Sequence, residues 1–273
     1  MNKLFKSIGV IIGFLAIFLV LAYGLYAMFK LAFPSTDLVL FQILASIIAD
    51  IAVSVCAVFY LKKHKDTSVI YERSKLLLFV PLLFVLWIFA QITTKSFVSL
   101  FPNENVSVAL AGTEVSVLYV FLTLLFAPIG EELLFRGVIF RECKKVMVLP
   151  YAYLISSLLF GFLHGNMTQL FLGFFAGFFF AVVYEYTHNL LCNIFFHFLF
   201  NLFSLLCGGL PLPDFFGYPA VFITVDLIIA GILVFVAYFV WFRRNDALLS
   251  HRDEIVARND DVYVRRIGDK HDF

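Results

Sequence analysis

Long runs of apolar residues constrain this chain more than any other feature. A helix needs about 20 mainly apolar residues to cross the hydrocarbon core of a bilayer, and the 273 residues are 62% apolar and only 14% charged. Soluble domains are roughly 45–50% apolar and about 25% charged. We therefore expect an all-α polytopic helix bundle in the cell membrane, with about eight transmembrane helices. The fifth and sixth are short. The eight predicted helices are Ile8–Met28, Leu38–Leu61, Leu76–Ile92, Val115–Phe140, Leu149–Leu163, Leu170–Tyr184, Leu190–Cys207 and Val221–Trp241.

The basic residues of the short loops predict the orientation, because such residues gather on the cytoplasmic side. If the amino terminus is cytoplasmic, only Lys30 and Lys95 fall on the opposite side. The cytoplasmic side then holds Lys3, Lys6, Lys62, Lys63, Lys65, Arg73, Lys75, Arg141, Lys144 and Lys145. Both termini are therefore expected to be cytoplasmic. The first run is longer than the 7–15-residue core of a signal peptide, so it is interpreted as a retained span.

Charge divides the chain into parts. Of its 39 charged residues, 14 lie between Arg243 and Phe273. We expect amino-terminal transmembrane helices over 1–113, a helix core over 114–207, one further transmembrane helix over 208–242 and a charged cytoplasmic tail over 243–273. The net charge of +1 and the lack of nucleic-acid motifs exclude nucleic acid as a partner. The four scattered cysteines form neither a disulfide framework nor a cysteine-based zinc site.

Ionisable and strongly polar side chains inside these runs are the candidates for function, because each costs at least a few kcal/mol in lipid unless it has a partner, a hydrated cavity or a task. The set comprises Asp50, Glu131, Glu132, Arg136, His164, His197, Asn201 and Asp226.

The first cluster is Glu131-Glu132-x-x-x-Arg136. Neighbouring helical residues point about 100° apart, so the two carboxylates are not expected to share one task, whereas Glu132 and Arg136 are spaced to pair. Exchanging both charges of this pair should then be tolerated better than either single change. Glu131 remains unpaired, and an unpaired carboxylate in a poorly solvated cavity is suited to be a general base. The alternative is that all three are solvated charges at a helix end.

Pro128 precedes this cluster by three residues. It lacks a backbone N–H, and in an α-helical register this frees the carbonyl of Leu124. A kink at this point would admit water to Glu131.

Two further clusters, Phe160-x-x-x-His164 and His197-x-x-x-Asn201, place their end residues on one helix face. Singly, an intramembrane His or Asn is typical of interhelical hydrogen bonding. Together with Glu131 they lie on three helices within 71 residues. Helix rise places Glu131 ~15 Å and His197 ~12 Å above the inner boundary but His164 ~22 Å, so a straight fifth helix carries His164 too deep.

These three motifs, in this order over residues 115–203, resemble the signature of the CPBP family of intramembrane proteases, which includes the type II CAAX prenyl endopeptidases and bacterial proteins linked to bacteriocin self-immunity. The resemblance implies an endopeptidase site in a helical cone that opens to the cytosol. By the same resemblance Glu131 would activate water, and His164 would orient it. His197 and Asn201 would stabilise the oxyanion, while Glu132 and Arg136 would brace the helix.

The resemblance leaves the metal and the substrate open. Glu131, His164 and His197 could supply the ligands of a catalytic zinc, but a metal would occupy the carboxylate needed as the base, so a metal-free glutamate mechanism is favoured and no cofactor is required. Expected partners are membrane lipid and a peptide or membrane-protein substrate, which would be prenylated if it follows the eukaryotic relatives. The alternatives from other classes are an ion-coupled transporter that uses Asp50, Glu131 and Asp226, or a noncatalytic immunity or scaffold protein. A protease predicts that Asp50 and Asp226 are dispensable.

Overall fold

The computed structural model of the chain describes residues 3–34, 38–64, 117–164 and 167–207, together with 80, 83 and 85–88. All of them belong to the first of two compact units, Met1–Ile229. Most of the predicted run Leu76–Ile92, the run Val221–Trp241 with Asp226, and the predicted tail lie outside the described residues.

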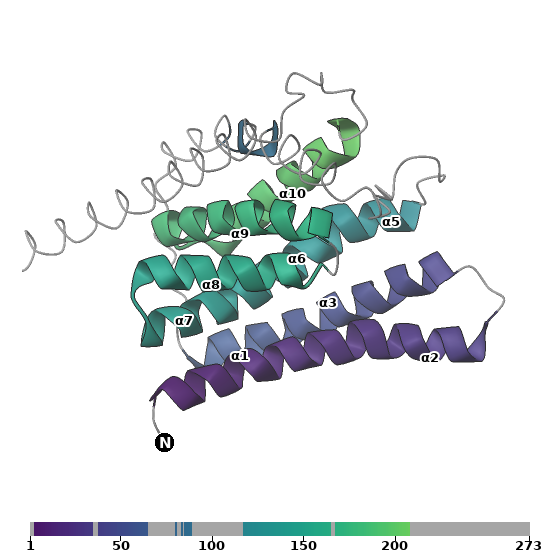
Figure 1. Cartoon of the computed structure of the whole chain (residues 1–273), viewed down its shortest axis with the longest axis horizontal. Coiled ribbons are helices and arrows are strands. Elements are labelled where there is room, and N and C mark those ends of the chain that lie inside the picture. Colours follow the sequence, from purple (N-terminus) through teal and green to yellow (C-terminus); the bar gives the residue numbers. More distant parts are fainter. Residues whose placement is uncertain are drawn as a thin grey trace, which may run out of the picture. The chain divides into compact units, whose positions relative to one another are not determined.

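The described part consists of helices joined by short connections (Figure 1). Among the described residues, two groups of consecutive helices form continuous rods in which α-helix alternates with the wider π-helix. The first rod comprises α1 (Lys3–Leu19), the π-helix η1 (Val20–Gly24) and α2 (Leu25–Ala32). The rod with the first motif comprises α5 (Val117–Phe121), η3 (Leu122–Phe126), α6 (Ala127–Glu132), η4 (Leu133–Phe140) and α7 (Arg141–Val146). The remaining helices are α3 (Leu38–Lys63), α8 (Leu149–Phe162), α9 (Met167–Thr187) and α10 (Leu190–Cys207).

Four of these helical stretches are long and apolar enough to cross a membrane: Lys3–Ala32, Leu40–Lys63, Leu118–Val146 and Gln169–Thr187. Leu149–Phe162 and Leu190–Leu206 are shorter apolar helices. The sixth predicted run is therefore longer than its apolar residues indicate, because α9 continues through polar residues at both ends. The chain is a multi-pass membrane protein, and eight spans with cytoplasmic termini remain a prediction.

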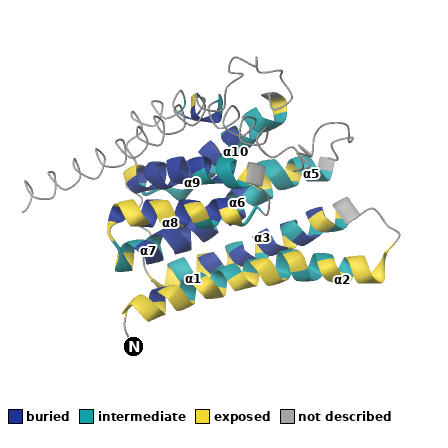
Figure 2. Cartoon of the chain, viewed as in Figure 1, coloured by how far each residue is buried: buried dark blue, intermediate teal, exposed yellow. Residues whose placement is uncertain are grey.

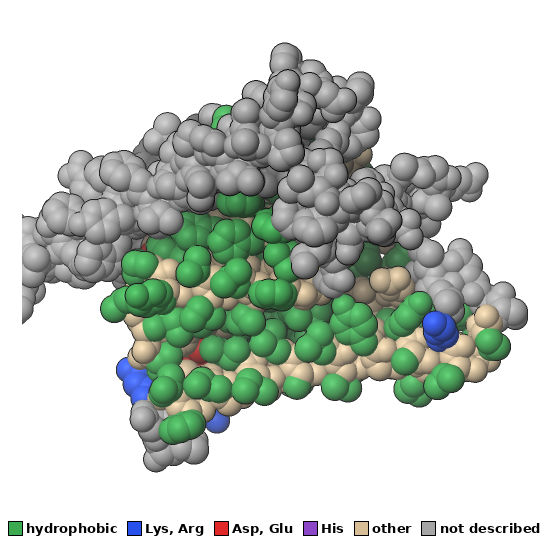
Figure 3. Space-filling view, viewed as in Figure 1, with side chains coloured by type: hydrophobic (Ala, Val, Ile, Leu, Met, Phe, Trp, Pro, Cys, Tyr) green, Lys and Arg blue, Asp and Glu red, His purple; other side chains and the backbone are tan. Residues whose placement is uncertain are grey.

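The outer face of the first rod is apolar and exposed. Phe5, Ile12, Val20, Met28 and Leu31 each leave more than half of their surface uncovered, and Figure 2 shows the first rod mostly exposed while the buried residues gather on α3 and α7–α10. Figure 3 shows hydrophobic side chains over almost all of the described surface on this face, with basic side chains near the helix ends. Such a surface suits hydrocarbon rather than water.

Glycines allow the closest helix contacts. A Cβ built on Gly161 of α8 would lie 2.4 Å from the carbonyl oxygen of Leu170 on α9, and one on Gly173 would lie 3.0 Å from the Gly161 Cα. A Cβ on Gly130 of α6 would lie 2.7 Å from Oδ1 of Asp50 on α3. The helices therefore approach closely at both crossings, and the second contact brings α3 against the turn that carries Glu131.

Candidate active site

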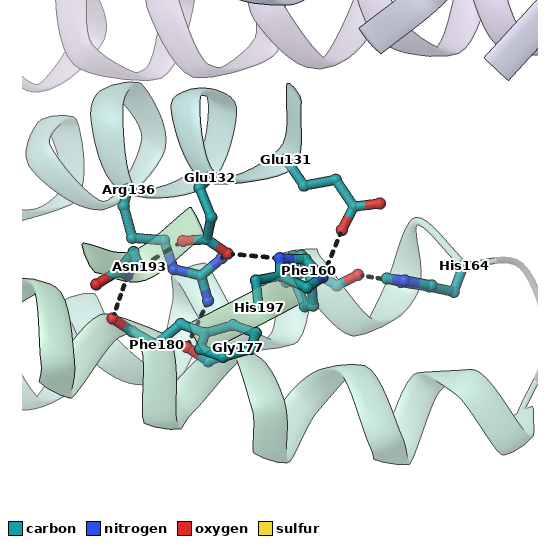
Figure 4. Close-up of polar contacts among 9 residues, drawn as sticks. All are labelled: Glu131, Glu132, Arg136, Phe160, His164, Gly177, Phe180, Asn193 and His197. Carbon is teal, nitrogen blue, oxygen red and sulfur yellow. Dashed lines mark hydrogen bonds and ion pairs between the residues drawn. The ribbon is translucent and has the colours of Figure 1, made fainter. Parts of the chain in front are cut away.

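Glu132 is the centre of a buried hydrogen-bond network drawn in Figure 4. Its Oε1 accepts from Arg136 Nη1 at 3.1 Å and pairs with His197 Nδ1 at 2.9 Å. Its Oε2 accepts from Asn193 Nδ2 at 3.1 Å. Both carboxylate oxygens thus have charged or strongly polar partners, as a buried carboxylate requires. The Glu132–Arg136 pair predicted from helical spacing is confirmed.

Arg136 is enclosed on all sides. Its side chain and that of Glu132 are 0% exposed, so the alternative of solvated charges at a helix end is wrong for these two residues. Its Nη2 donates to the Gly177 carbonyl at 2.6 Å, and its guanidinium carbon lies 4.8 Å from the Phe160 ring centroid and 5.4 Å from that of Phe180. Contacts with two aromatic faces and a carboxylate compensate the loss of water.

His197 lies between two carboxylates (Figure 4). Its Nδ1 faces Glu132, while its Nε2 lies 3.7 Å from Oε2 of Glu131. The ring stacks on Phe180 at a centroid distance of 4.8 Å. The two adjacent carboxylates therefore meet one imidazole from opposite sides, Glu132 at Nδ1 and Glu131 at Nε2, and separate tasks for them stay a prediction.

The contacts of His197 define its protonation pattern. A carboxylate accepts only, so the contact with Glu132 assigns a hydrogen to Nδ1 and leaves Nε2 toward Glu131. The 3.7 Å separation between Nε2 and Oε2 of Glu131 is longer than a hydrogen bond, so neither atom satisfies the other. Oε2 of Glu131 has no hydrogen-bond partner among the described residues, and the Glu131 side chain is 17% exposed. Glu131 is therefore the least enclosed member of the network, although its Oε2 is buried.

His164 is set apart from this pair. Its Nδ1 contacts the Phe160 carbonyl oxygen at 2.8 Å, one turn back on α8. The ring of Phe160, rather than that of His164, lies near His197, and the two ring centroids are 5.8 Å apart. Figure 4 shows His164 farther along α8 than the Glu131–His197 contact. Phe160 and His164 are four residues apart, a helix rise of ~6 Å, which is close to the ~7 Å by which helix rise sets His164 deeper than Glu131.

Asn201 is held by the backbone of the first motif's rod. Its Nδ2 donates to the Thr123 carbonyl at 2.8 Å. The prediction that Pro128 frees the Leu124 carbonyl assumed an α-helical register, but residues 122–126 form a π-helix in which the Ala127 N–H donates to Leu122. In this wider register the missing N–H of Pro128 would face the carbonyl of Thr123. The freed carbonyl is therefore that of Thr123 rather than that of Leu124.

Asp50 is packed against the helix that carries the first motif. It is 4% exposed, and its side chain abuts Gly130. This carboxyl group therefore lies against the turn that carries Glu131, and its dispensability in a protease stays a prediction.

The predicted zinc ligands do not form a metal site as they are placed. Within the described ranges, no group of three or more His, Cys, Asp or Glu side chains is arranged to hold a metal ion. Glu131 and His197 approach each other, but His164 is bonded to its own helix. The donor set therefore does not fit a three-ligand zinc centre.

Asn193 is a member of the network that the sequence analysis missed. It is 0% exposed and bridges Glu132 and the Phe180 carbonyl, the latter at 2.7 Å. It precedes His197 by four residues, so Asn193, His197 and Asn201 follow one face of α10 at successive turns. That repeat of polar residues in an apolar run was a usable signal.

Comparisons with known proteins agree with the motifs. A sequence model of the family described as "Type II CAAX prenyl endopeptidase Rce1-like" matches residues 113–203. The chain is also similar to the protein named "Putative membrane peptidase YdiL" of Bacillus subtilis (strain 168), with 29% identity over 132 residues, which is 48% of this chain and 53% of that protein. The chain thus spans about half the length of this curated relative. No solved structure gives a significant match.

The matched segment contains all of the network described above. Residues 113–203 include the helices α6, η4, α8 and α9. They also include the part of α10 that carries Asn193, His197 and Asn201. Within this segment the chain is similar to the type II CAAX prenyl endopeptidase-like family, and the resemblance predicted from the three motifs is confirmed.

Proposed function

We propose that the chain is an intramembrane endopeptidase in which Glu131 activates water for attack on a peptide carbonyl. The observation that carries the proposal is the alignment of Glu132, His197 and Glu131, in which one imidazole has a fully buried carboxylate at Nδ1 and a partly exposed one at Nε2. The first contact orients the ring, and the second marks the place where a proton can be exchanged.

The reaction follows from these positions. Water held against Glu131 loses a proton to that carboxylate as its oxygen bonds to the carbonyl carbon. Glu131 passes this proton on to Nε2 of His197, and the resulting imidazolium and the Asn201 amide stabilise the oxyanion. The C–N bond then breaks as the proton returns to the leaving nitrogen. A positioned donor of this kind contributes roughly 2.7–4 kcal/mol, and Glu132 favours the charged imidazole at the moment the oxyanion needs it.

His164 has a supporting role in this proposal. Its Nδ1 is engaged by the Phe160 carbonyl, so the ring has a fixed orientation and its Nε2 can orient the water or the substrate carbonyl from the side of α8. The proposed reaction runs without a metal, because Glu131 acts as the base in its own right. The substrate is a peptide or a membrane-protein segment, and the family match favours one that ends in a prenylated cysteine box.

The test compares the full-length protein with its Glu131→Gln variant in native membranes, by sequencing newly formed peptide amino termini. A quenched-fluorescence peptide with a farnesylated cysteine box serves as a defined probe in parallel. We expect cleavages that disappear in Glu131→Gln. Glu142→Gln is the matched control, because Glu142 is also buried on the same rod but contacts Tyr60 and Lys145 outside the network.

Two outcomes would overturn the proposal. Identical cleavage patterns in wild type and Glu131→Gln would show that this carboxylate is not the base. If wild type produces no cleavage and Asp50→Asn abolishes ion flux in vesicles, the transporter alternative would replace it.

A further inference from the structure

The backbone just before Glu131 has a carbonyl that its own helix does not satisfy. In η3 the Ala127 N–H donates to the Leu122 carbonyl, five residues back. The next N–H in this register would come from residue 128 and face the Thr123 carbonyl. Residue 128 is proline, which has no N–H. A carbonyl within a membrane rod needs another donor.

The side chain of Asn201 is that donor. Its Nδ2 lies 2.8 Å from the Thr123 oxygen, across a separation of 78 residues in sequence. A side-chain amide has two N–H groups in one plane. When one of them is bonded to a backbone carbonyl, the plane is fixed and the direction of the second N–H is fixed with it.

We propose that Pro128 is a positioning residue for Asn201: by withholding a backbone N–H it leaves the Thr123 carbonyl free to anchor the Asn201 amide, whose second N–H is thereby directed to the reacting carbonyl. The inference deepens the proposed function, on which the role of the second N–H rests. With an N–H at position 128, the backbone would supply the donor and the Asn201 side chain would lose its anchor.

The anchoring is tested without any substrate. Thermal unfolding of the full-length protein in detergent is measured for wild type, Pro128→Ala, Asn201→Ala and the double variant. We expect Asn201→Ala to lower Tm strongly in wild type, because the Thr123 carbonyl loses its donor. It should lower Tm less in the Pro128→Ala background, where the backbone at position 128 has an N–H to supply. Equal Tm shifts in the two backgrounds would overturn the inference.

Pro150→Ala is the matched control. Pro150 also lies in the first turn of its helix, α8, and is exposed. Asn201→Ala should lower Tm in this background as much as in wild type. If Pro128→Ala does not fold, hydrogen exchange of the Asn201 side-chain amide in wild type decides instead: one slow and one fast hydrogen support the anchor, and two equally fast ones overturn it.

Kinetics test the catalytic part with the farnesylated peptide as the probe. Pro128→Ala should lower kcat at unchanged KM. The loss should not exceed the ~10²–10³-fold loss expected when an oxyanion donor is removed outright. Pro150→Ala should leave kcat unchanged. Full kcat in folded Pro128→Ala would overturn the inference. Unequal Tm shifts together with a wild type that cleaves nothing would leave the anchor supported and remove the proposed function.

Discussion

Asn193 on α10 donates its side-chain amide to Glu132 on α6 at 3.1 Å, although the two residues are 61 positions apart. The same amide donates to the Phe180 carbonyl on α9. One side chain therefore links three helices one turn away from His197.

Removing this link should destabilise the protein. Asn193→Ala leaves one oxygen of Glu132 and the Phe180 carbonyl without their donor, and each unsatisfied buried acceptor costs about 1–3 kcal/mol. The expected result is a lower unfolding midpoint in detergent and weaker peptide cleavage. An unfolding midpoint equal to that of wild type would mean that other groups satisfy both acceptors.

Exchanging the charges of Glu132 and Arg136 should fail, contrary to what their spacing alone predicts. Glu132 also accepts from Asn193 and pairs with His197, and Arg136 also donates to Gly177. An exchanged pair would present a guanidinium to the Nδ1–H of His197. Either single neutralisation should cost about 3–5 kcal/mol, and the double exchange should express no better. Recovery of expression in the double variant would restore the simple ion-pair interpretation.

Gly161→Ala should disrupt the contact between α8 and α9, because the new Cβ would lie 2.4 Å from the Leu170 carbonyl oxygen. Overpacking of this kind costs about 1–3 kcal/mol or more. Gly13→Ala is the control, since a Cβ at Gly13 meets nothing within 4 Å. That change should be neutral or stabilising by up to ~1 kcal/mol. Thermal unfolding of the two variants in one detergent compares them directly.

His188 should make stability depend on pH. It lies between α9 and α10, and burial, reinforced by Lys144 and Arg141, lowers its pKa below the usual 6.5. The folded state therefore favours the neutral ring, and stability is complete above pH 6.5 and decreases as the pH falls through the lowered pKa.

His188→Asn tests this dependence. The residue has a φ of 49°, a left-handed conformation that Asn tolerates. The variant should unfold at the wild-type midpoint near neutral pH and lose less stability on acidification. Parallel pH curves for the two proteins would contradict the assignment.

Chelation should leave the proposed peptidase active. Purified protein that cleaves the farnesylated peptide should retain its rate after phenanthroline treatment and dialysis, and should contain less than one equivalent of zinc. Loss of cleavage that zinc alone restores would favour the metal-dependent alternative and would require His164 to leave the Phe160 carbonyl.

The sequence predicts the local contacts of the site well, because helical spacing fixes which side chains share a face. The pairing of Glu132 with Arg136 follows from that rule, and so does the helical character of the described apolar runs. The depth of His164 relative to Glu131 did not follow from helix rise, which gave a mismatch between these residues, and only the structure places the Phe160 ring near His197.

Other features were not accessible from the sequence. Hydropathy does not distinguish α-helix from π-helix, so the wider turns on either side of Glu131 and Glu132, and the shift of the free carbonyl to Thr123, were missed. The placement of Asp50 against Gly130 depends on how two helices cross, which no spacing within either helix reveals.

The enclosure of Arg136 also bears on how the protein is made. The carboxylate that pairs with Arg136 lies on the same rod. The carbonyl acceptor of Arg136 and one of the aromatic rings come from α9, and the other aromatic ring comes from α8. The imidazole beside it arrives only with α10. A nascent chain therefore carries no assembled centre until α10 is inserted, and we expect the proposed activity to arise only at that point.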